Sequence, residues 1–77
     1  MEGVEKKIFD VCIAYVEEIE GRRLNLNYPF SRDISLYIEI DSDWRKREGS
    51  IVLRNGEIEI HTDNSEFRCY FEEKLFD

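Results

Sequence analysis

Histidine and cysteine, the residue types that most zinc sites depend on, are scarce in this chain. It has one histidine, one proline, no glutamine, and two cysteines that form no C-x-x-C pair. No cluster of cysteine and histidine has the spacing of a zinc site. We therefore expect no metal, no cofactor and no enzymatic activity.

Long apolar runs are also missing. The longest extends only from Val11 to Val16, whereas a membrane-spanning helix needs about 20 apolar residues. Glu2 and Glu5 stand where a secretory signal carries positive charge. These features predict a cytoplasmic protein. Cys12 and Cys69 both fall on predicted apolar faces, so we expect two reduced core thiols rather than a disulfide.

The 77 residues are enough for one domain, 1–77, with a marginal core. Much of its surface stays available for binding something large. The net charge of −7 is uneven, with −4 in residues 1–20, +1 in residues 21–49 and −4 in residues 50–77. Such a chain repels nucleic acid as a whole. Abundant Glu, Arg and Ile without Gln fit a thermophile, and equally fit a genomic bias.

Val4 to Glu20 has the period of an amphipathic helix, and Gly21 is placed to end it. The core stripe consists of Val4, Ile8, Val11, Cys12, Tyr15 and Ile19. Three further apolar residues, Phe9, Ile13 and Val16, widen the stripe along one flank. This flank predicts either contact with a covering loop or a surface for self-association as a homodimer.

Strand patterns follow the helix. Residues 23–28 and 34–41 alternate between apolar and polar, and a charged loop over residues 41–49 comes next. Asn55-Gly56 then predicts a type I′ turn, because these two residues tolerate positive φ. The resulting hairpin pairs Leu53 with Ile58, Ile51 with Ile60, and Arg54 with Glu57.

A second hairpin is predicted through Asp63-Asn64, which would add a last strand. Its register pairs Ile60 with Phe67, Ile58 with Cys69, Glu59 with Arg68, and His61 with Glu66. Apolar pairs then share one face and opposite charges share the other. The expected fold is α+β, with one N-terminal helix packed on a four- or five-stranded antiparallel sheet.

Three polar groups resemble active sites, and each has a structural interpretation that we prefer. His61 lacks a second strong ligand, and its expected partner is Glu66. The segment 41–43 opens like a calcium loop but breaks at Arg45, so turn or capping roles are expected. Glu57 and Glu59 share a strand face, but glycosidase chemistry needs a cleft for the sugar.

A tryptophan beside three basic residues is the main candidate for contact with nucleic acid. Trp44 would stack on a base while Arg45, Lys46 and Arg47 hold phosphate. The alternative is that these bases pair with nearby acids, which are Asp41, Asp43 and Glu48.

Charges on the predicted helix oppose its dipole. Lys6 and Lys7 lie near its positive end, while Glu17, Glu18 and Glu20 lie near its negative end, which indicates a binding surface. The leading hypothesis is a small non-enzymatic binding module, a regulator or inhibitor of a basic, nucleic-acid-handling protein. Its expected contact residues are Glu17, Glu18, Glu20, Glu57, Glu59 and Glu66. The alternatives are a nucleic-acid binder using residues 44–47 and a structural homodimer using the apolar helix flank.

Overall fold

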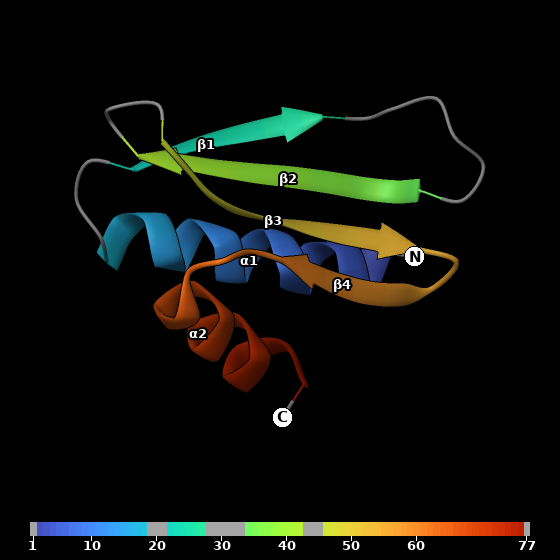
Figure 1. Cartoon of the computed structure of the whole chain (residues 1–77). Helices are drawn as coiled ribbons and strands as arrows, with labels where there is room; N and C mark the ends of the chain where they lie inside the picture. The colour runs from blue at the N-terminus through green and yellow to red at the C-terminus, as the bar shows by residue number, and fades with distance from the viewer. Residues whose placement is uncertain (1, 19–21, 28–33, 43–45, 77) are drawn as a thin grey trace.

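The computed structural model describes residues 2–18, 22–27, 34–42 and 46–76. The elements in chain order are α1 (Glu2–Glu18), β1 (Arg22–Asn27), β2 (Ile34–Ser42), β3 (Arg47–Arg54), β4 (Glu57–His61) and α2 (Ser65–Phe76). The four strands form one antiparallel sheet in the order β1-β2-β3-β4 (Figure 1). The expected α+β fold with a helix on an antiparallel sheet is confirmed, with four strands.

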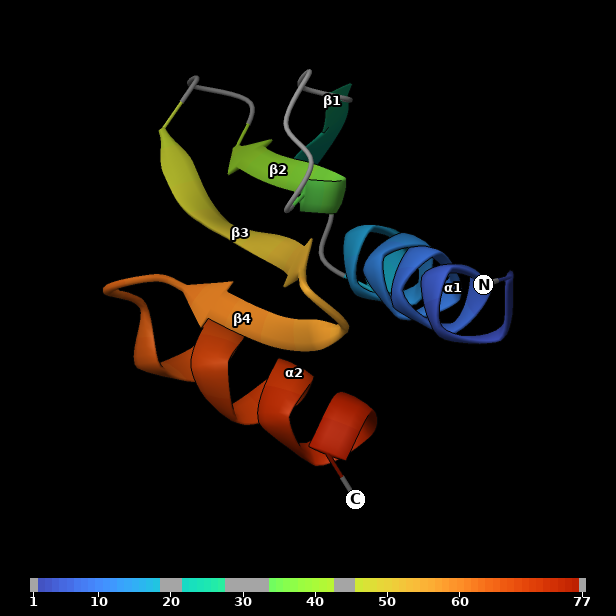
Figure 2. The ribbon, with the colours of Figure 1, turned by 90° about the vertical axis from the view of Figure 1, so that its right-hand side faces the viewer.

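The sheet curves around α1, and α2 lies beside β4 (Figure 2). The predicted helix stripe faces the sheet, with Ile8, Cys12 and Tyr15 almost completely buried. Val11 is half-buried, whereas Val4 near the start of the helix remains 41% exposed. Ile19, Glu20 and Gly21, which were expected to complete and end the helix, lie outside the described residues.

Both early strands form where alternation predicts them. In β2 the side chains of Leu36, Ile38 and Ile40 are buried on the helix side. The register pairs Leu24 with Ile40, which places the apolar face of β1 on the same side. The expected bounds of the loop over residues 41–49 are wrong, because β2 continues to Ser42 and β3 begins at Arg47.

The first hairpin is confirmed in full. β3 and β4 pair Leu53 with Ile58, and the pairs Ile51–Ile60 and Arg54–Glu57 follow the same register. Asn55 and Gly56 have φ values of 53° and 78°, as a type I′ turn requires. This turn is a local property, and the sequence predicts it because few residues adopt that conformation.

The second hairpin is wrong, because residues 65–76 form helix α2 instead of a fifth strand. Asn64 starts this helix as its N-cap, since its Oδ1 accepts hydrogen bonds from the backbone N–H groups of Glu66 and Phe67 at 2.9 and 3.1 Å. Side chains at four-residue spacing, Phe67, Phe71 and Leu75, are then buried on one face. The two-residue alternation was therefore a weaker signal than this helical period.

Several side-chain predictions that depended on the fifth strand are also wrong. Arg68 does not oppose Glu59; its Nη2 donates to the backbone oxygen of Thr62 at 3.2 Å and its Nη1 lies 3.7 Å from Glu72. Cys69 points to solvent, so only Cys12 is a core thiol, although neither cysteine is in a disulfide. A strand at this place would have turned Cys69 inward, whereas the helix turns it away from the buried face.

An aromatic cluster joins α2 to α1. The Tyr15 ring lies 5.3 Å from Phe67, 5.0 Å from Tyr70 and 5.2 Å from Phe71, measured between ring centroids. Edge and tilted contacts of this kind add stability beyond the burial of apolar area. They fix the last turns of α1 beside the first turns of α2.

Candidate functional site

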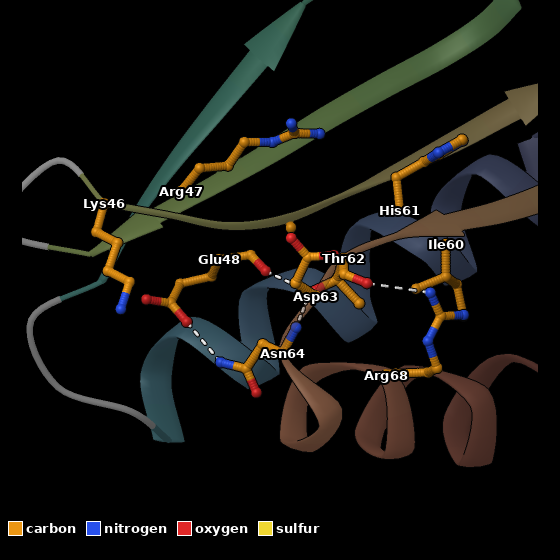
Figure 3. A pocket seen from close by; sticks show the side chains of 10 residues that line it. Lys46, Arg47, Glu48, Ile60, His61, Thr62, Asp63, Asn64 and Arg68 are labelled. Carbon is orange, nitrogen blue, oxygen red and sulfur yellow. Dashed lines mark hydrogen bonds between the residues drawn. The ribbon is translucent and has the colours of Figure 1, made fainter.

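A polar groove of about 820 Å³ opens where the start of β3, the end of β4 and the start of α2 meet (Figure 3). Its lining residues are Lys46, Arg47, Glu48, Gly49, Ile60, His61, Thr62, Asp63, Asn64 and Arg68. In Figure 3, Arg47 and His61 point away from α2, whereas Glu48 reaches toward Asn64. Three bases and a histidine therefore gather in one groove of an acidic protein.

Much of the groove's floor is engaged in internal hydrogen bonds. Thr62 Oγ1 donates to the backbone oxygen of Glu48 and accepts from the backbone N–H of Asn64 at 2.9 Å. Asn64 Nδ2 donates to Glu48 Oε1 at 2.7 Å, and Glu48 is only 8% exposed. These bonds tie the start of β3 to the cap of α2, so they have a structural role.

His61 pairs with Glu59 rather than with Glu66, so that prediction is wrong. The imidazole Nε2 lies 2.9 Å from Glu59 Oε1, and Arg54 Nε donates to Glu59 Oε2 at 3.2 Å. The hydrogen bond from His61, helped by the charge of Arg54, holds the pKa of the Glu59 carboxyl below its usual value. Glu66 cannot oppose His61 because it lies in α2.

The residue types of a hydrolase triad occur together on the outer face of the sheet. Ser50 stands opposite His61 in the strand register, and His61 contacts Glu59. However, Ser50 Oγ accepts a hydrogen bond from Arg47 Nη2 at 2.8 Å, and the residue is only 1% exposed. A nucleophile must be in reach of its base and its substrate, so this geometry does not make Ser50 a nucleophile.

No metal centre stands out in the described ranges. Within them, no three His, Cys, Asp or Glu side chains lie close enough together to hold an ion. Of the calcium-like segment, Asp43 lies outside those ranges, and Asp41 belongs to β2, where it accepts a hydrogen bond from Asn25 Nδ2 at 2.8 Å. Asp41 and Ser42 therefore have strand positions rather than the turn or capping roles expected for them.

The basic segment is described only in part, because Trp44 and Arg45 lie outside the described residues. Lys46 and Arg47 are exposed at the start of β3. Arg47 Nε lies 3.4 Å from Glu39 Oε2, an acid that the sequence did not indicate as its partner. The groove also adds Arg68 and His61 to the bases expected there.

The structure divides the predicted acidic contact residues between two places. Glu57 and Glu59 lie on β4, at the sheet. Glu17 and Glu18 are exposed at the end of α1, and Glu66 is exposed at the start of α2. Glu20 lies outside the described residues.

Tyr70 connects the two helices in this acidic region. Burial, and then the negative charge of Glu18, raise the pKa of the Tyr70 hydroxyl. On α2, Glu66 precedes Tyr70 by four residues and Glu73 follows it by three, so both lie beside it on the helix surface. We call Glu18, Glu66, Tyr70 and Glu73 the acidic face.

Sequence reasoning missed Tyr70 and Glu73. The signal that would have found them is the helical spacing of residues 66, 70 and 73, which is visible only once α2 is recognised as a helix. The half-buried Tyr70 ring packs at 5.0 Å from Tyr15 and 5.5 Å from Phe71. The ammonium of Lys74 lies 5.6 Å from its centroid.

The predicted apolar flank of α1 is only partly covered. Phe9 and Val16 are half-buried and pack against the core, while Ile13 remains 36% exposed. Leu26 on β1 is 41% exposed. The role of this flank in self-association therefore stays a prediction.

Comparisons of the chain with models of known protein families, with curated proteins and with solved structures give no match. Neither of the two described helices is long and apolar enough to cross a membrane.

Proposed function

We propose that the chain is a small, non-enzymatic binding module of the cytoplasm, a regulator or inhibitor whose partner is a protein with a basic surface. The observation that supports this proposal is the acidic face, where Glu18 of α1 and two carboxylates of α2 lie near one half-buried tyrosine. The free thiols of Cys12 and Cys69 fit a reducing compartment.

The pairing of charges over the surface supports this choice of partner. Four bases, Lys6, Arg47, Arg54 and Arg68, each lie within 4 Å of a carboxylate oxygen. In contrast, within the described part of the chain, no ion pair engages the three carboxylates of the acidic face. Unpaired charge of one sign steers a partner of the opposite sign and speeds association.

Tyr70 gives the acidic face a centre for binding. Tyrosine is enriched among the residues that contribute most to binding energy, because it offers a large rigid area and a polar tip. The ring of Tyr70 is already held by Tyr15 and Phe71, so little conformational entropy is lost when a partner covers it. A guanidinium or ammonium group of the partner could both contact the ring and pair with Glu18 or Glu66.

A basic surface of this kind is typical of proteins that bind phosphate backbones. Carboxylates at the acidic face would then occupy positions that phosphates normally take, which is the physical basis for an inhibitory role.

The proposal can be tested by affinity capture from the host lysate followed by mass spectrometry. The bait is the wild-type chain, and the comparison bait carries Glu18→Lys and Glu66→Lys. We expect a basic protein on the first bait, lost from the second and released by moderate salt. Glu5→Lys with Asp10→Lys is the matched control, because it makes the same change of charge on α1 outside the acidic face.

Loss of the partner from both variant baits would show that net charge matters and the acidic face does not. Retention on the Glu18→Lys, Glu66→Lys bait would also contradict the proposal. Tyr70→Ala adds a charge-neutral comparison, and it should weaken capture without changing the salt dependence.

The second candidate is nucleic-acid binding at the groove, because the groove gathers Lys46, Arg47, Arg68 and His61 from three parts of the chain. Ion pairs with Glu39, Glu59 and Glu72 compensate several of these groups. We rank this candidate below the acidic face for that reason.

A further inference from the structure

We infer that β1 and the adjoining flank of α1 form a two-fold interface between two copies of this chain. In this arrangement the two β1 strands pair antiparallel and join the two sheets into one. The inference is independent of the partner proposed above, because it uses the side of α1 opposite to α2.

β1 is an edge strand with an available backbone. Strand order places β2 on one side of it, and no described strand pairs with its other side. Unpaired N–H and C=O groups along such an edge are a template for another strand, and proteins usually guard it with proline, bulges or inward charges. The stretch from Leu24 to Leu26 pairs regularly with β2 and contains none of these guards.

An apolar patch lies beside this edge. Leu26 is 41% exposed and Ile13 is 36% exposed, while Phe9, Val16 and Leu24 are half-buried and pack against the core cluster. The side chains of Phe9 and Val16 project from the side of α1 opposite to Glu18. Glu18 in turn lies close enough to α2 for its charge to affect Tyr70. They therefore face the side where β1 lies, as the order β1, α1, α2 in Figure 2 indicates.

For the self-pairing of β1 we infer a register centred on Asn25. Both copies must keep their helices on the same side of the joined sheet, so the two-fold axis passes through a residue pair. An axis at Asn25 sets Leu24 opposite Leu26 of the other copy, and Arg23 opposite Asn27. An axis at Leu24 would instead set Leu26 opposite Arg22, which loses the apolar match.

Charge also favours this side of the molecule as the interface. Each chain carries −7, so two copies repel each other unless they meet away from their acids. β1 has two arginines and no acid, and the acidic face lies on the α2 side of α1. A dimer held here should consequently become tighter as salt screens the remaining repulsion.

A stable dimer buries more surface area than pairing of the two β1 strands can supply, so α1 must contribute to the interface. Stable interfaces bury about 800 Å² per partner, which is about 15% of the 5271 Å² surface of this chain. A six-residue strand is only about 20 Å long. Contact between the exposed Ile13 side chains and their surroundings on α1 must therefore add to strand pairing.

Sedimentation equilibrium of the purified chain at high micromolar concentration is the direct test. We expect a dimer that Leu26→Lys and Ile13→Asp each convert to a folded monomer, with folding checked by circular dichroism. Val4→Lys is the matched control, since Val4 is as exposed as Leu26 but lies near the start of α1. A wild-type monomer, or equal dissociation by Leu26→Lys and Val4→Lys, would overturn the inference.

Cysteine cross-linking tests the register without relying on destabilised variants. In a Cys69→Ser background, Asn25→Cys places each new thiol opposite its own copy, so oxidation should give a covalent dimer. Arg23→Cys is the control, because its two copies would stand about 13 Å apart along the strands. Residues 23 and 25 both lie beside Asp41 of β2, so the two introduced thiols have similar surroundings. Cross-linking of Arg23→Cys as fast as Asn25→Cys would reject this pairing.

Discussion

The ring of Phe67 in α2 lies directly against the backbone of Gly49 in β3. A Cβ atom added to Gly49 would stand only 2.7 Å from Phe67 Cε1 and 2.9 Å from Thr62 Cβ. Both Gly49 and Phe67 are buried. The close approach of α2 to the sheet, which forms the floor of the groove, therefore depends on a glycine at this position.

Gly49→Ala should lower the free energy of unfolding by about 1–3 kcal/mol, because overpacking forces the Phe67 ring or α2 to move. Urea titration followed by circular dichroism measures this change. Gly3→Ala is the matched control, since nothing lies within 4 Å of its added Cβ and alanine favours a helix by about 1 kcal/mol. Equal stability of the two variants would contradict the close contact.

Only one of the two cysteines should react in the folded protein. Cys69 is exposed, whereas burial raises the pKa of the Cys12 thiol from 9.0 to about 12. A chromogenic thiol reagent should therefore modify one thiol per chain in buffer and two in denaturant. Rapid modification of both thiols without denaturant would contradict the burial of Cys12.

The same pKa difference makes stability fall at alkaline pH. Since the folded pKa exceeds the unfolded one, this contribution is complete below pH 9 and is lost as the pH rises toward 12. The slope should approach about 1.4 kcal/mol per pH unit relative to Cys12→Ala, which lacks the group. Parallel stability curves of wild type and Cys12→Ala between pH 8 and 11 would refute this assignment.

Removing the imidazole of His61 should raise the pKa of Glu59. The hydrogen bond from His61 is the largest cause that lowers this pKa, and Arg54 adds a smaller electrostatic contribution. NMR titration of the Glu59 side chain should show a larger rise in His61→Ala than in Arg54→Ala. In the wild type the pairing is present at neutral pH and is lost as the pH falls through the lowered pKa. A larger rise in Arg54→Ala would contradict this order.

The groove should bind nucleic acid weakly or not at all. Fluorescence of Trp44, the single tryptophan, can be followed while a single-stranded oligonucleotide is added at low salt. We expect little change, because acids compensate the groove bases and the charge of −7 repels phosphate. A salt-sensitive complex that Arg47→Ala and Arg68→Ala both weaken would place the nucleic-acid candidate first.

Elements with a strong local signal were predictable from the sequence. Asn55-Gly56 allows one turn type, and that turn fixes the pairing of Leu53 with Ile58. The stripe of α1 repeats over four turns, so chance alternation could not imitate it. Tertiary contacts were not needed to recognise either element.

The segment from Phe67 to Leu75 carries two periods at once. Phe67, Cys69 and Phe71 alternate as in a strand, while Phe67, Phe71 and Leu75 repeat as in a helix. Apart from Tyr70, the remaining positions hold charged residues, which fit either choice. Packing of Phe67 and Phe71 around Tyr15, together with the cap at Asn64, favours the helix.

The sequence by itself determined the acidic charge, the α+β class, the first helix, and the hairpin with its register, because each depends on composition or on neighbours along the chain. Only the tertiary structure decided which carboxylates gather. Glu18 and Glu66 both lie near Tyr70 because α2 is a helix that docks on Tyr15, while Glu59 is held by Arg54 and His61 at the sheet. Such groupings follow from the burial of aromatic rings far apart in the chain, and no local pattern of charges contains that information.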